Sequence, residues 1–335
     1  MTRILISGLG SIGRRHLGNL VELGVADILL HRTGKSTLPD DDLKEFESES
    51  DLARALERWQ PDAILVTNPT ALHLDIAVPA ARSGCHLFIE KPLSHSMQGI
   101  DDLEAAVESG GGQVLIGFHF RFNPGLRAIK ELLKEGAVGR PLSARVYWGE
   151  HLPDWHPWED YRASYSARSN LGGGVVLTLS HPFDYLRWLL GEISDVQALT
   201  ANSGSLGIDV EDTASVLMGL EQGLVANVQL DYLRRPPAHS LEIIGTEGAI
   251  QWEGLSGHAR WYDPKDAQWN ELPPPEGFER NTMFMEEMRH FLAIVAGEEQ
   301  PACGLKDGIR VLEIVEAVHE SAKTGSRVAL MRVKA

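Results

Sequence analysis

Cysteine, positive charge and long apolar runs are scarce in this chain of 335 residues. Its two cysteines, Cys85 and Cys303, are too few for a disulfide framework, so we expect a cytoplasmic protein. Acidic residues outnumber basic ones by 47 to 31, and the net charge of −16 argues against nucleic acid or an anionic membrane as a partner, since both need a basic face. No apolar run approaches the roughly 20 residues of a membrane span. We also expect no signal peptide and no metal site.

Hydrophobic residues make up 43% of the chain, enough for a packed core, and the length suggests about two domains. The first part alternates strand and helix patterns, as a parallel α/β sheet does. From about Leu142 the runs become longer and alternate apolar with polar residues, which predicts a mostly antiparallel sheet flanked by helices. We therefore predict an α/β domain over residues 1–121 and an α+β domain over residues 122–335.

The predicted elements follow from these patterns. The strands of the first sheet are Ile4–Ser7, Asp27–His31, Ala63–Thr67, His86–Glu90 and Val114–Gly117. Those of the second sheet are Leu142–Trp148, Thr213–Leu220, Leu224–Asp231, Ser240–Ile244, Ala249–Trp252 and Ala259–Tyr262. Its flanking helices are Pro182–Leu190, Thr282–Ala296 and Leu305–Ala322. Residues 264–281, which include three consecutive prolines, are predicted to form an exposed loop.

A glycine-rich sequence directly after the first strand carries the strongest signal. Gly8, Gly10 and Gly13 form the pattern G-x-G-x-x-G between a strand and a helix. Gly8 allows the tight turn, Gly10 lets the backbone approach a pyrophosphate, and Gly13 lets the helix pack close to the strand. The helix N-terminus adds unpaired N–H groups and a positive dipole end, which favour phosphate. We predict a dinucleotide site here, with Ser11 and Ile12 also contacting the cofactor.

The end of the second strand indicates which dinucleotide binds. An NAD-preferring fold usually places a carboxylate there to hold the ribose 2′-hydroxyl. This chain has Arg32, Thr33, Lys35 and Ser36 instead, and a guanidinium suits a 2′-phosphate. We therefore favour NADP(H) over NAD(H), while a solvated basic loop remains the alternative.

Four further motifs follow in order along the chain. They are Thr67-Asn68-Pro69 with His73, then Ile89-Glu90-Lys91-Pro92, then Gly172-Gly173-Gly174, then Ser180-His181-Pro182-Phe183-Asp184. This order resembles the Gfo/Idh/MocA family, which includes glucose–fructose oxidoreductase and inositol dehydrogenase. The resemblance spans essentially the whole chain, and the Glu-Lys-Pro motif with the later H-x-x-D helix start is its most specific part.

The resemblance implies a Rossmann domain followed by a domain with a large, mostly antiparallel open sheet. That sheet commonly serves as an oligomer interface, so we expect a homodimer or homotetramer. Members of the family typically oxidise or reduce a hydroxyl-bearing carbon of a sugar, cyclitol or nucleotide sugar.

The resemblance also implies roles for individual residues. Lys91 would lie beside the nicotinamide and the substrate hydroxyl, with a cis Lys91–Pro92 bond, and Glu90 would hold that strand end. His181 corresponds to the catalytic histidine. The cofactor crevice would be lined by Thr67, Asn68, Pro69 and His73.

The chemistry of these side chains agrees with such roles. Hydride transfer from an alcohol needs the hydroxyl proton removed by a base that titrates near neutrality, which suits His181. Pro182 in the first turn predicts that a helix begins here, with Ser180 or His181 as its N-cap. The helix N-terminus disfavours the imidazolium form. Lys91 would stabilise the alkoxide as it develops. The alternatives are a surface lysine and a capping histidine.

One position departs from the family pattern. Family members commonly carry an aspartate three or four residues before this histidine, where the chain has Leu177 and Thr178. Asp184 lies one turn after His181 and could contact it at i,i+3, although an acid in a first helical turn is also simply favourable to the dipole. The departure puts the dehydrogenase rate, and the reaction itself, in question.

Residues 151–170 are the predicted substrate side. Aromatic faces interleaved with polar planar groups suit a sugar ring or a base, and a guanidinium suits a carboxylate or phosphate. The candidates are Arg121, Trp155, His156 and Arg168. The alternative is that the aromatic side chains anchor a long loop or a subunit contact.

We therefore predict an NAD(P)-dependent oxidoreductase acting on a small sugar or nucleotide-sugar substrate. Two alternatives stay open. One is a non-catalytic protein that senses NADP(H) or a sugar. The other is an enzyme that uses a tightly bound nucleotide transiently during an elimination or glycosidic cleavage.

Overall fold

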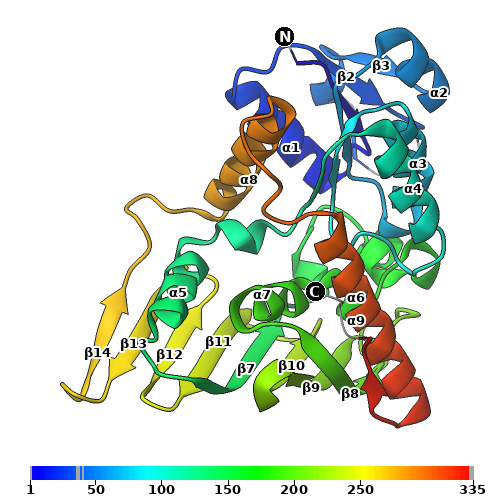
Figure 1. Cartoon of the computed structure of the whole chain (residues 1–335). Coiled ribbons are helices and arrows are strands. Elements are labelled where there is room, and N and C mark those ends of the chain that lie inside the picture. Colours follow the sequence, from blue (N-terminus) through cyan, green and yellow to red (C-terminus); the bar gives the residue numbers. More distant parts are fainter. Residues whose placement is uncertain (1, 35–37, 40, 332–335) are drawn as a thin grey trace. The chain divides into compact units, whose positions relative to one another are not determined.

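A computed structural model describes residues 2–34, 38–39 and 41–331 (Figure 1). The chain divides into two compact units, which we describe one at a time. The first unit comprises Met1–Phe118, Asn170–Gly172 and Asn281–Leu312, and the second comprises His119–Ser169, Gly173–Arg280 and Glu313–Ala335.

The first unit is built on a six-stranded sheet in which every neighbouring pair of strands is parallel. Its strands are β1 (Ile4–Ser7), β2 (Ile28–His31), β3 (Glu47–Glu49), β4 (Ala63–Val66), β5 (His86–Ile89) and β6 (Val114–Ile116). The order is β3-β2-β1-β4-β5-β6, so the connection reverses direction between β1 and β4. Ligands bind outside the carboxyl ends of the strands at such a reversal. The predicted Rossmann sheet is confirmed, and the ends of its five predicted strands lie within one residue of the expected ones, whereas β3 was not predicted.

The helices of the first unit include one that returns from much later in the chain. They are α1 (Ser11–Glu22), α2 (Leu52–Arg54), α3 (His73–Arg82), α4 (Ile100–Gly110) and α8 (Arg280–Val295), with the start of α9 (Leu305–Thr324). Asn281, at the start of α8, donates from its side-chain amide to the Asn19 carbonyl oxygen Oδ1 of α1 at 3.0 Å. The order of the sequence does not predict that α8 belongs to the first unit, because residues 119–169 and 173–280, which precede it, belong to the second unit.

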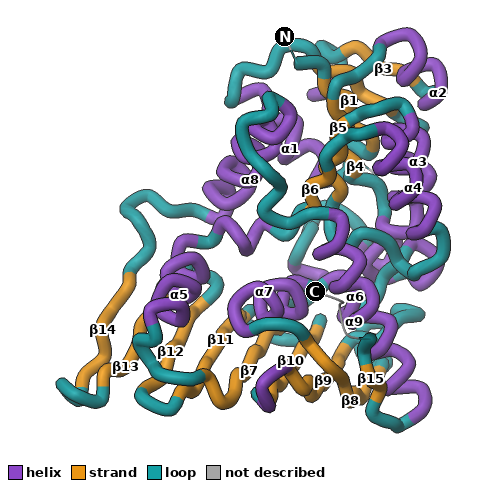
Figure 2. The backbone as a smooth tube through the Cα atoms, viewed as in Figure 1, coloured by secondary structure: helices purple, strands orange, loops and turns teal. Residues whose placement is uncertain are grey.

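The second unit is built on a nine-stranded sheet (Figure 2). Its strands are β7 (Pro141–Gly149), β8 (Ile193–Ala201), β9 (Thr213–Leu220), β10 (Val225–Asp231), β11 (Ala238–Gly245), β12 (Gly248–Glu253), β13 (Ala259–Asp263), β14 (Gln268–Leu272) and β15 (Val328–Ala329). The order is β14-β13-β12-β11-β7-β10-β9-β8-β15, and β7 runs parallel to β10 while the other neighbours are antiparallel. This confirms the predicted mostly antiparallel sheet.

One prediction in this sheet is wrong. Residues 264–281 were expected to be a loop, but they contain β14. The strand is held by side chains on its neighbour: Tyr262 meets the Trp269 ring edge-on at 5.6 Å, and the Arg260 guanidinium lies over the same ring at 4.5 Å. Such cross-strand pairs stabilise a short edge strand, and they cannot be read from a five-residue segment that precedes a proline run.

Helices cover one face of this sheet, as Figure 1 shows for α5 and α7. The helices of the second unit are α5 (Pro124–Glu135), α6 (Val175–Thr178), α7 (His181–Leu190) and the remainder of α9. Ala144, Val146 and Trp148 of β7 alternate toward the buried face, whereas Leu199 and Leu217 on neighbouring strands point to solvent. Among residues 2–34, 38–39 and 41–331, no helix is long and apolar enough to cross a membrane.

Candidate functional site

The glycine loop of the first unit forms a tightly packed turn with one open position. Gly8 adopts φ +100°, and a Cβ there would lie 2.5 Å from the Asn68 nitrogen. A Cβ on Gly13 would lie 1.9 Å from the Gly8 oxygen. Around Gly10, in contrast, a Cβ would meet no protein atom within 4 Å. The loop therefore needs Gly8 and Gly13 for its own packing, while the space beside Gly10 is available to a ligand.

The N-terminus of α1 is prepared for an anion. Gly10 is its N-cap, no side chain caps the first turn, and that turn holds no acidic residue. The first N–H groups of a helix lack intrahelical partners and carry the positive end of the dipole. Together with the open space at Gly10, this end of α1 fits the pyrophosphate of a dinucleotide.

Arg32 follows the end of β2, and the acidic residue Asp42 lies further along the chain in a short 3₁₀ turn, Asp41–Leu43. Arg32 donates its backbone N–H to the Glu49 oxygen at 3.0 Å, and Thr33 is exposed. Arg14, in the first turns of α1, binds the carboxylate of Asp42. This hydrogen bond lowers the pKa of Asp42, and the charge of Arg32 acts in the same direction. Lys35 and Ser36, predicted to bind a 2′-phosphate, lie outside the described residues.

The end of β4 is fixed by two buried side chains. Thr67 donates from Oγ1 to the Gly8 oxygen at 2.5 Å, which ties this strand end to the glycine loop. The His73 ring lies between backbone oxygens, with Nε2 2.9 Å from that of Asn68 and Nδ1 3.1 Å from that of Pro92. Burial lowers the pKa of His73. His73 thus joins the ends of β4 and β5, and Asn68 Oδ1 is a buried acceptor that has no hydrogen-bond partner within the described part of the chain.

The end of β5 carries the Glu-Lys-Pro motif, and the Lys91–Pro92 peptide bond is cis. The buried carboxylate of Glu90 uses both oxygens: Oε1 lies 2.7 Å from His16 Nε2, and Oε2 accepts the Lys91 backbone N–H at 3.1 Å. The backbone on either side of the motif is therefore held by side chains from α1 and from α3.

In the second unit, His181 is the first residue of α7, with Ser180 as N-cap and Pro182 in the first turn. Its ring is 1% exposed and is surrounded by other rings. His119 lies edge-on at 4.4 Å between centroids, Phe120 at 4.8 Å, and Trp148 at 5.7 Å. Ring packing therefore fixes the orientation of this imidazole.

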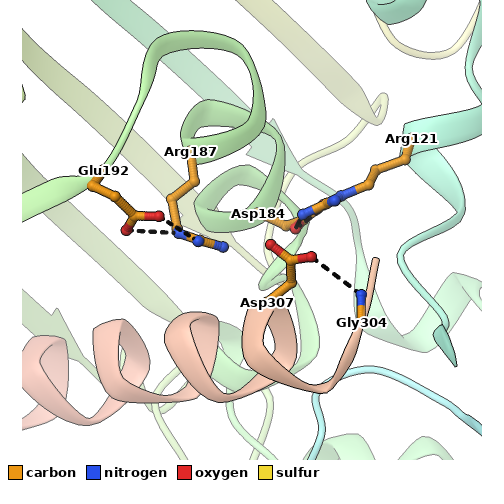
Figure 3. A network of polar contacts seen from close by, with 6 residues as sticks. All are labelled: Arg121, Asp184, Arg187, Glu192, Gly304 and Asp307. Carbon is orange, nitrogen blue, oxygen red and sulfur yellow. Dashed lines mark hydrogen bonds and ion pairs between the residues drawn. The ribbon is translucent and has the colours of Figure 1, made fainter. Parts of the chain in front are cut away.

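Asp184, expected as a possible partner of His181, forms an ion pair with Arg121. Arg121 donates from Nη2 to Asp184 Oδ1 at 2.6 Å and from Nε to Oδ2 at 3.0 Å (Figure 3). Both side chains are buried, with exposed fractions of 5% for Arg121 and 1% for Asp184. The geometry makes this pair part of the core of the second unit, although Arg121 was predicted to bind substrate and Asp184 to act in catalysis as the partner of His181.

Leu177 and Thr178 stand where family members commonly carry an aspartate, and both are buried in α6. A carboxylate does reach this helix from another segment, because Glu211 Oε1 accepts the Val176 backbone N–H at 3.2 Å. A Cβ on Gly174 would lie 2.4 Å from the same oxygen, so the last glycine of the triplet makes room for Glu211. Glu211 caps α6 and was not predicted.

The remaining substrate candidates lie on the long loop after β7. Trp155 is half-buried, with its ring edge-on to Tyr232 at 5.5 Å. His156 packs against Trp158 at 5.3 Å, and Trp158 is exposed. Arg168 is exposed beside the glycine triplet. Trp155 Nε1 and His156 Nδ1 are buried nitrogens without a hydrogen-bond partner in the described protein, which suits atoms that meet a ligand.

Comparisons with known proteins cover both units. The family model for the oxidoreductase family with an NAD-binding Rossmann fold matches residues 2–118, and the model for the GFO/IDH/MocA C-terminal domain matches residues 126–251. The chain belongs to the GFO/IDH/MocA oxidoreductase family. It is therefore related to enzymes that pair a nicotinamide-binding Rossmann domain with the second domain seen here.

Individual relatives in this family are distant but align over nearly the full length. The chain is 26% identical to an uncharacterized oxidoreductase, YrbE, of Bacillus subtilis, covering 98% of each chain, and 26% identical to a myo-inositol 2-dehydrogenase of Thermotoga maritima, covering 99% of each. A levoglucosan dehydrogenase in complex with NADH and levoglucosan superposes with a TM-score of 0.87 at 21% identity, covering 99% of this chain and 100% of that one. At this identity the superposition shows the shared fold.

Sequence reasoning missed four residues that shape this family member's candidate site. Asp42 and Glu211 are close to predicted residues only in space, whereas His119 lies two residues before Arg121 in the sequence. Glu287 could have been found from the local sequence. It lies three residues after Phe284 and four before Phe291, so it is an acidic residue on the apolar face of α8.

Proposed function

We propose that this protein transfers a hydride between a nicotinamide cofactor and the hydroxyl or keto carbon of a sugar, a cyclitol or a nucleotide sugar. The observation that carries the proposal is the glycine loop with its open position at Gly10, at the carboxyl edge of the sheet where Lys91 follows the end of β5. The printed names of relatives, which include myo-inositol 2-dehydrogenase and D-apiose dehydrogenase, support a polyhydroxylated substrate. A WlbA dehydrogenase bound to NADH and UDP-GlcNAcA shares the fold, with a TM-score of 0.81.

The proposed contacts with the pyrophosphate and the crevice come from residues that follow β1, β4 and β5. Gly8, Gly10, Ser11, Ile12 and Gly13 hold the pyrophosphate, while Thr67, Asn68, Pro69, His73 and Glu90 shape the crevice. Asn68 Oδ1, a buried acceptor without a partner, is suited to a ligand donor. When bound, the cofactor accepts or supplies the hydride.

We favour NADP(H), with Arg32 and Thr33 at the 2′-phosphate. The Asp42 carboxylate works against this choice, because it occupies Arg14 and lies in the field of Arg32. Replacing Asp42 with Asn removes a negative charge next to the proposed 2′-phosphate. We expect Asp42→Asn to raise the affinity for NADPH about tenfold while changing that for NADH by less than threefold. Equal effects on both nucleotides in a fluorescence titration would contradict this placement.

The proposed chemistry uses His181 and Lys91. His181 removes the hydroxyl proton through its imidazole, and the Lys91 ammonium stabilises the negative charge that develops on the oxygen. Arg168, Trp155 and His156 recognise the substrate. Arg121 and Asp184 contribute by holding the first turn of α7, which begins at His181.

The proposed assembly is a homo-oligomer formed through the uncovered face of the nine-stranded sheet. Leu199, Leu217 and Val225 are exposed on β8, β9 and β10 of this sheet. Apolar side chains exposed on neighbouring strands favour association with a second surface. Sedimentation should then give a dimer or tetramer.

The experiment that tests the function begins with titration of NAD⁺, NADH, NADP⁺ and NADPH, followed by a panel of sugars, cyclitols and nucleotide sugars with the tightest nucleotide. Lys91→Ala and His181→Asn should each abolish turnover. Lys134→Ala is the matched control, because Lys134 is 75% exposed on α5. Full activity in both site variants would refute the assignment.

The replacement of the family aspartate by Leu177 and Thr178 keeps a second candidate function in view. Tight cofactor binding without turnover on the whole panel would favour a sensor of NADP(H) or of a sugar. A nucleotide that co-purifies and is recycled without net consumption would instead indicate elimination or glycosidic cleavage.

A further inference from the structure

Glu287 is a fully buried acid whose role the proposed function does not explain. Its side chain on α8 is 0% exposed, and among the described residues neither carboxyl oxygen has a hydrogen-bond partner. Burying a charged carboxylate without donors costs far more than burying the neutral acid. Burial and the nearby charge of Glu90 raise the pKa of Glu287 well above its usual range, which agrees with a neutral side chain.

Glu287 lies on the face of α8 that packs against residues next to the Glu-Lys-Pro motif. Phe284 and Phe291 flank it on the same face of α8. Phe284 lies edge-on to the His16 ring at 6.0 Å, and Phe291 lies edge-on to Phe88 at 5.6 Å. Phe88 and Glu90 lie two residues apart at the end of β5, so they share one face of that strand. The α8 face therefore packs on the His16–Glu90 pair from both sides of Glu287.

His16 and Glu90 are themselves coupled to Lys91. His16 Nε2 lies 2.7 Å from Glu90 Oε1, and the other Glu90 oxygen accepts the backbone N–H of Lys91. His16 is fully buried, and its ring meets Phe88 edge-on at 4.8 Å, which fixes its orientation. The carboxylate of Glu90 is thereby turned toward the backbone of Lys91.

We propose that His16 and Glu287 are positioning residues for Lys91, and that they act by holding the Glu90 carboxylate in this orientation. His16 supplies the hydrogen bond, and Glu287 supplies an uncharged neighbour whose O–H can turn toward Glu90. An ionised Glu287 would repel the Glu90 carboxylate. An apolar side chain at position 287 could not interact with Glu90 through a polar group. The inference rests on the proposed role of Lys91 in the reaction.

Loss of either positioning residue should free Glu90 to turn toward the Lys91 ammonium. A carboxylate beside an ammonium stabilises its charged form. The Lys91 amine should then react more slowly with an acylating reagent at neutral pH, because only the uncharged amine is nucleophilic. This readout needs neither cofactor nor substrate, so it separates the inference from the proposed function.

The experiment compares four variants of the full chain. His16→Phe keeps the ring packing and removes the donor, and His16→Gln restores a donor in the place of Nε2. Glu287→Leu removes the carboxyl group, and Glu287→Gln keeps its shape without charge. Acetic anhydride labelling of Lys91 is measured by mass spectrometry relative to Lys134, which is 75% exposed. Thermal unfolding checks that each variant is folded.

We expect Lys91 labelling to slow at least threefold in His16→Phe and Glu287→Leu and to stay within about twofold of the wild type in the two Gln variants. With a substrate in hand, kcat should fall about tenfold in the first pair at nearly unchanged KM, as expected for loss of a hydrogen bond to a charged group. Unchanged labelling in folded His16→Phe and Glu287→Leu overturns the inference. If His16→Phe does not fold, the two Glu287 variants decide by the same criterion. Altered labelling without any wild-type turnover supports the positioning and refutes only the proposed reaction.

Discussion

The buried ion pair of the second unit allows a quantitative prediction. Arg121 and Asp184 are joined by contacts of 2.6 and 3.0 Å, and both are almost completely buried. Removing one partner of such a pair leaves an uncompensated charge in the core, which costs about 3–5 kcal/mol. We therefore expect Asp184→Ala and Arg121→Ala each to lower the free energy of unfolding by about that amount.

A double substitution shows whether the single variants lose stability because a buried charge is left unpaired or because the ion pair itself stabilises the fold. Replacing both residues with apolar ones of similar size removes both desolvation penalties, and such exchanges are often neutral or stabilising. Arg121→Met combined with Asp184→Leu should therefore recover most of the stability that each single variant loses. The same double variant tests the positioning of α7, because His181 begins the helix that carries Asp184.

Urea unfolding followed by tryptophan fluorescence is the suitable assay. All tryptophans except Trp59 lie in the second unit, so the signal reports on the unit that holds the pair. Arg162→Ala is the matched control, since its ion pair with Asp160 is 59% exposed on both sides and an exposed pair contributes little to stability. If Asp184→Ala costs no more than Arg162→Ala, the buried pair does not hold this unit together and the reasoning fails.

Three further predictions concern the glycine loop and two buried titratable groups. Gly10→Ala should keep the melting temperature within a few degrees and weaken NAD(P)H binding at least tenfold, whereas Gly13→Ala should lose about 1–3 kcal/mol of stability in urea, because its Cβ would strike the Gly8 oxygen. Burial lowers the pKa of His239 to about 3, from 6.5 when exposed, so the unfolded chain binds the extra proton between these values. Stability should fall by about 1.4 kcal/mol per pH unit on acidification through this window, and His239→Phe should flatten that slope in urea titrations from pH 4 to 7. Glu287 is the opposite case: with its pKa raised above the usual 4.5, stability is lost as pH rises past 4.5. The gain in melting temperature of Glu287→Gln over the wild type should therefore grow with pH and vanish near pH 4.

The sequence predicted those parts of the fold that local patterns encode. Parallel strands buried on both faces read as short apolar runs, and β1, β4 and β5 were found within one residue at each end for this reason. Alternation identified the strands that have one solvent-facing side, such as β9. The glycine loop could be assigned because its residues are contiguous, so one turn carries the whole signal.

Contacts that join distant segments could not be predicted in this way. The position of α8 depends on contacts between its apolar stripe and residues of β5 and α1, which lie 203 and 268 residues earlier in the pairs Phe88–Phe291 and His16–Phe284. The pairing of Asp184 with Arg121 was missed because the helical neighbour at i,i+3 is the only candidate that spacing reveals. Asp42 was missed for a similar reason: the loop after β2 brings it back to Arg14, although it lies outside the usual position for a ribose-binding acid.

The missing aspartate before His181 is best understood through what surrounds the histidine. In a site with a carboxylate partner, that group both orients the imidazole and increases its basicity. Here the rings of His119, Phe120 and Trp148 orient the imidazole. Ring packing therefore supplies the orientation that the aspartate gives in other members, so a smaller side chain at Phe120 should lower kcat more than it weakens cofactor binding.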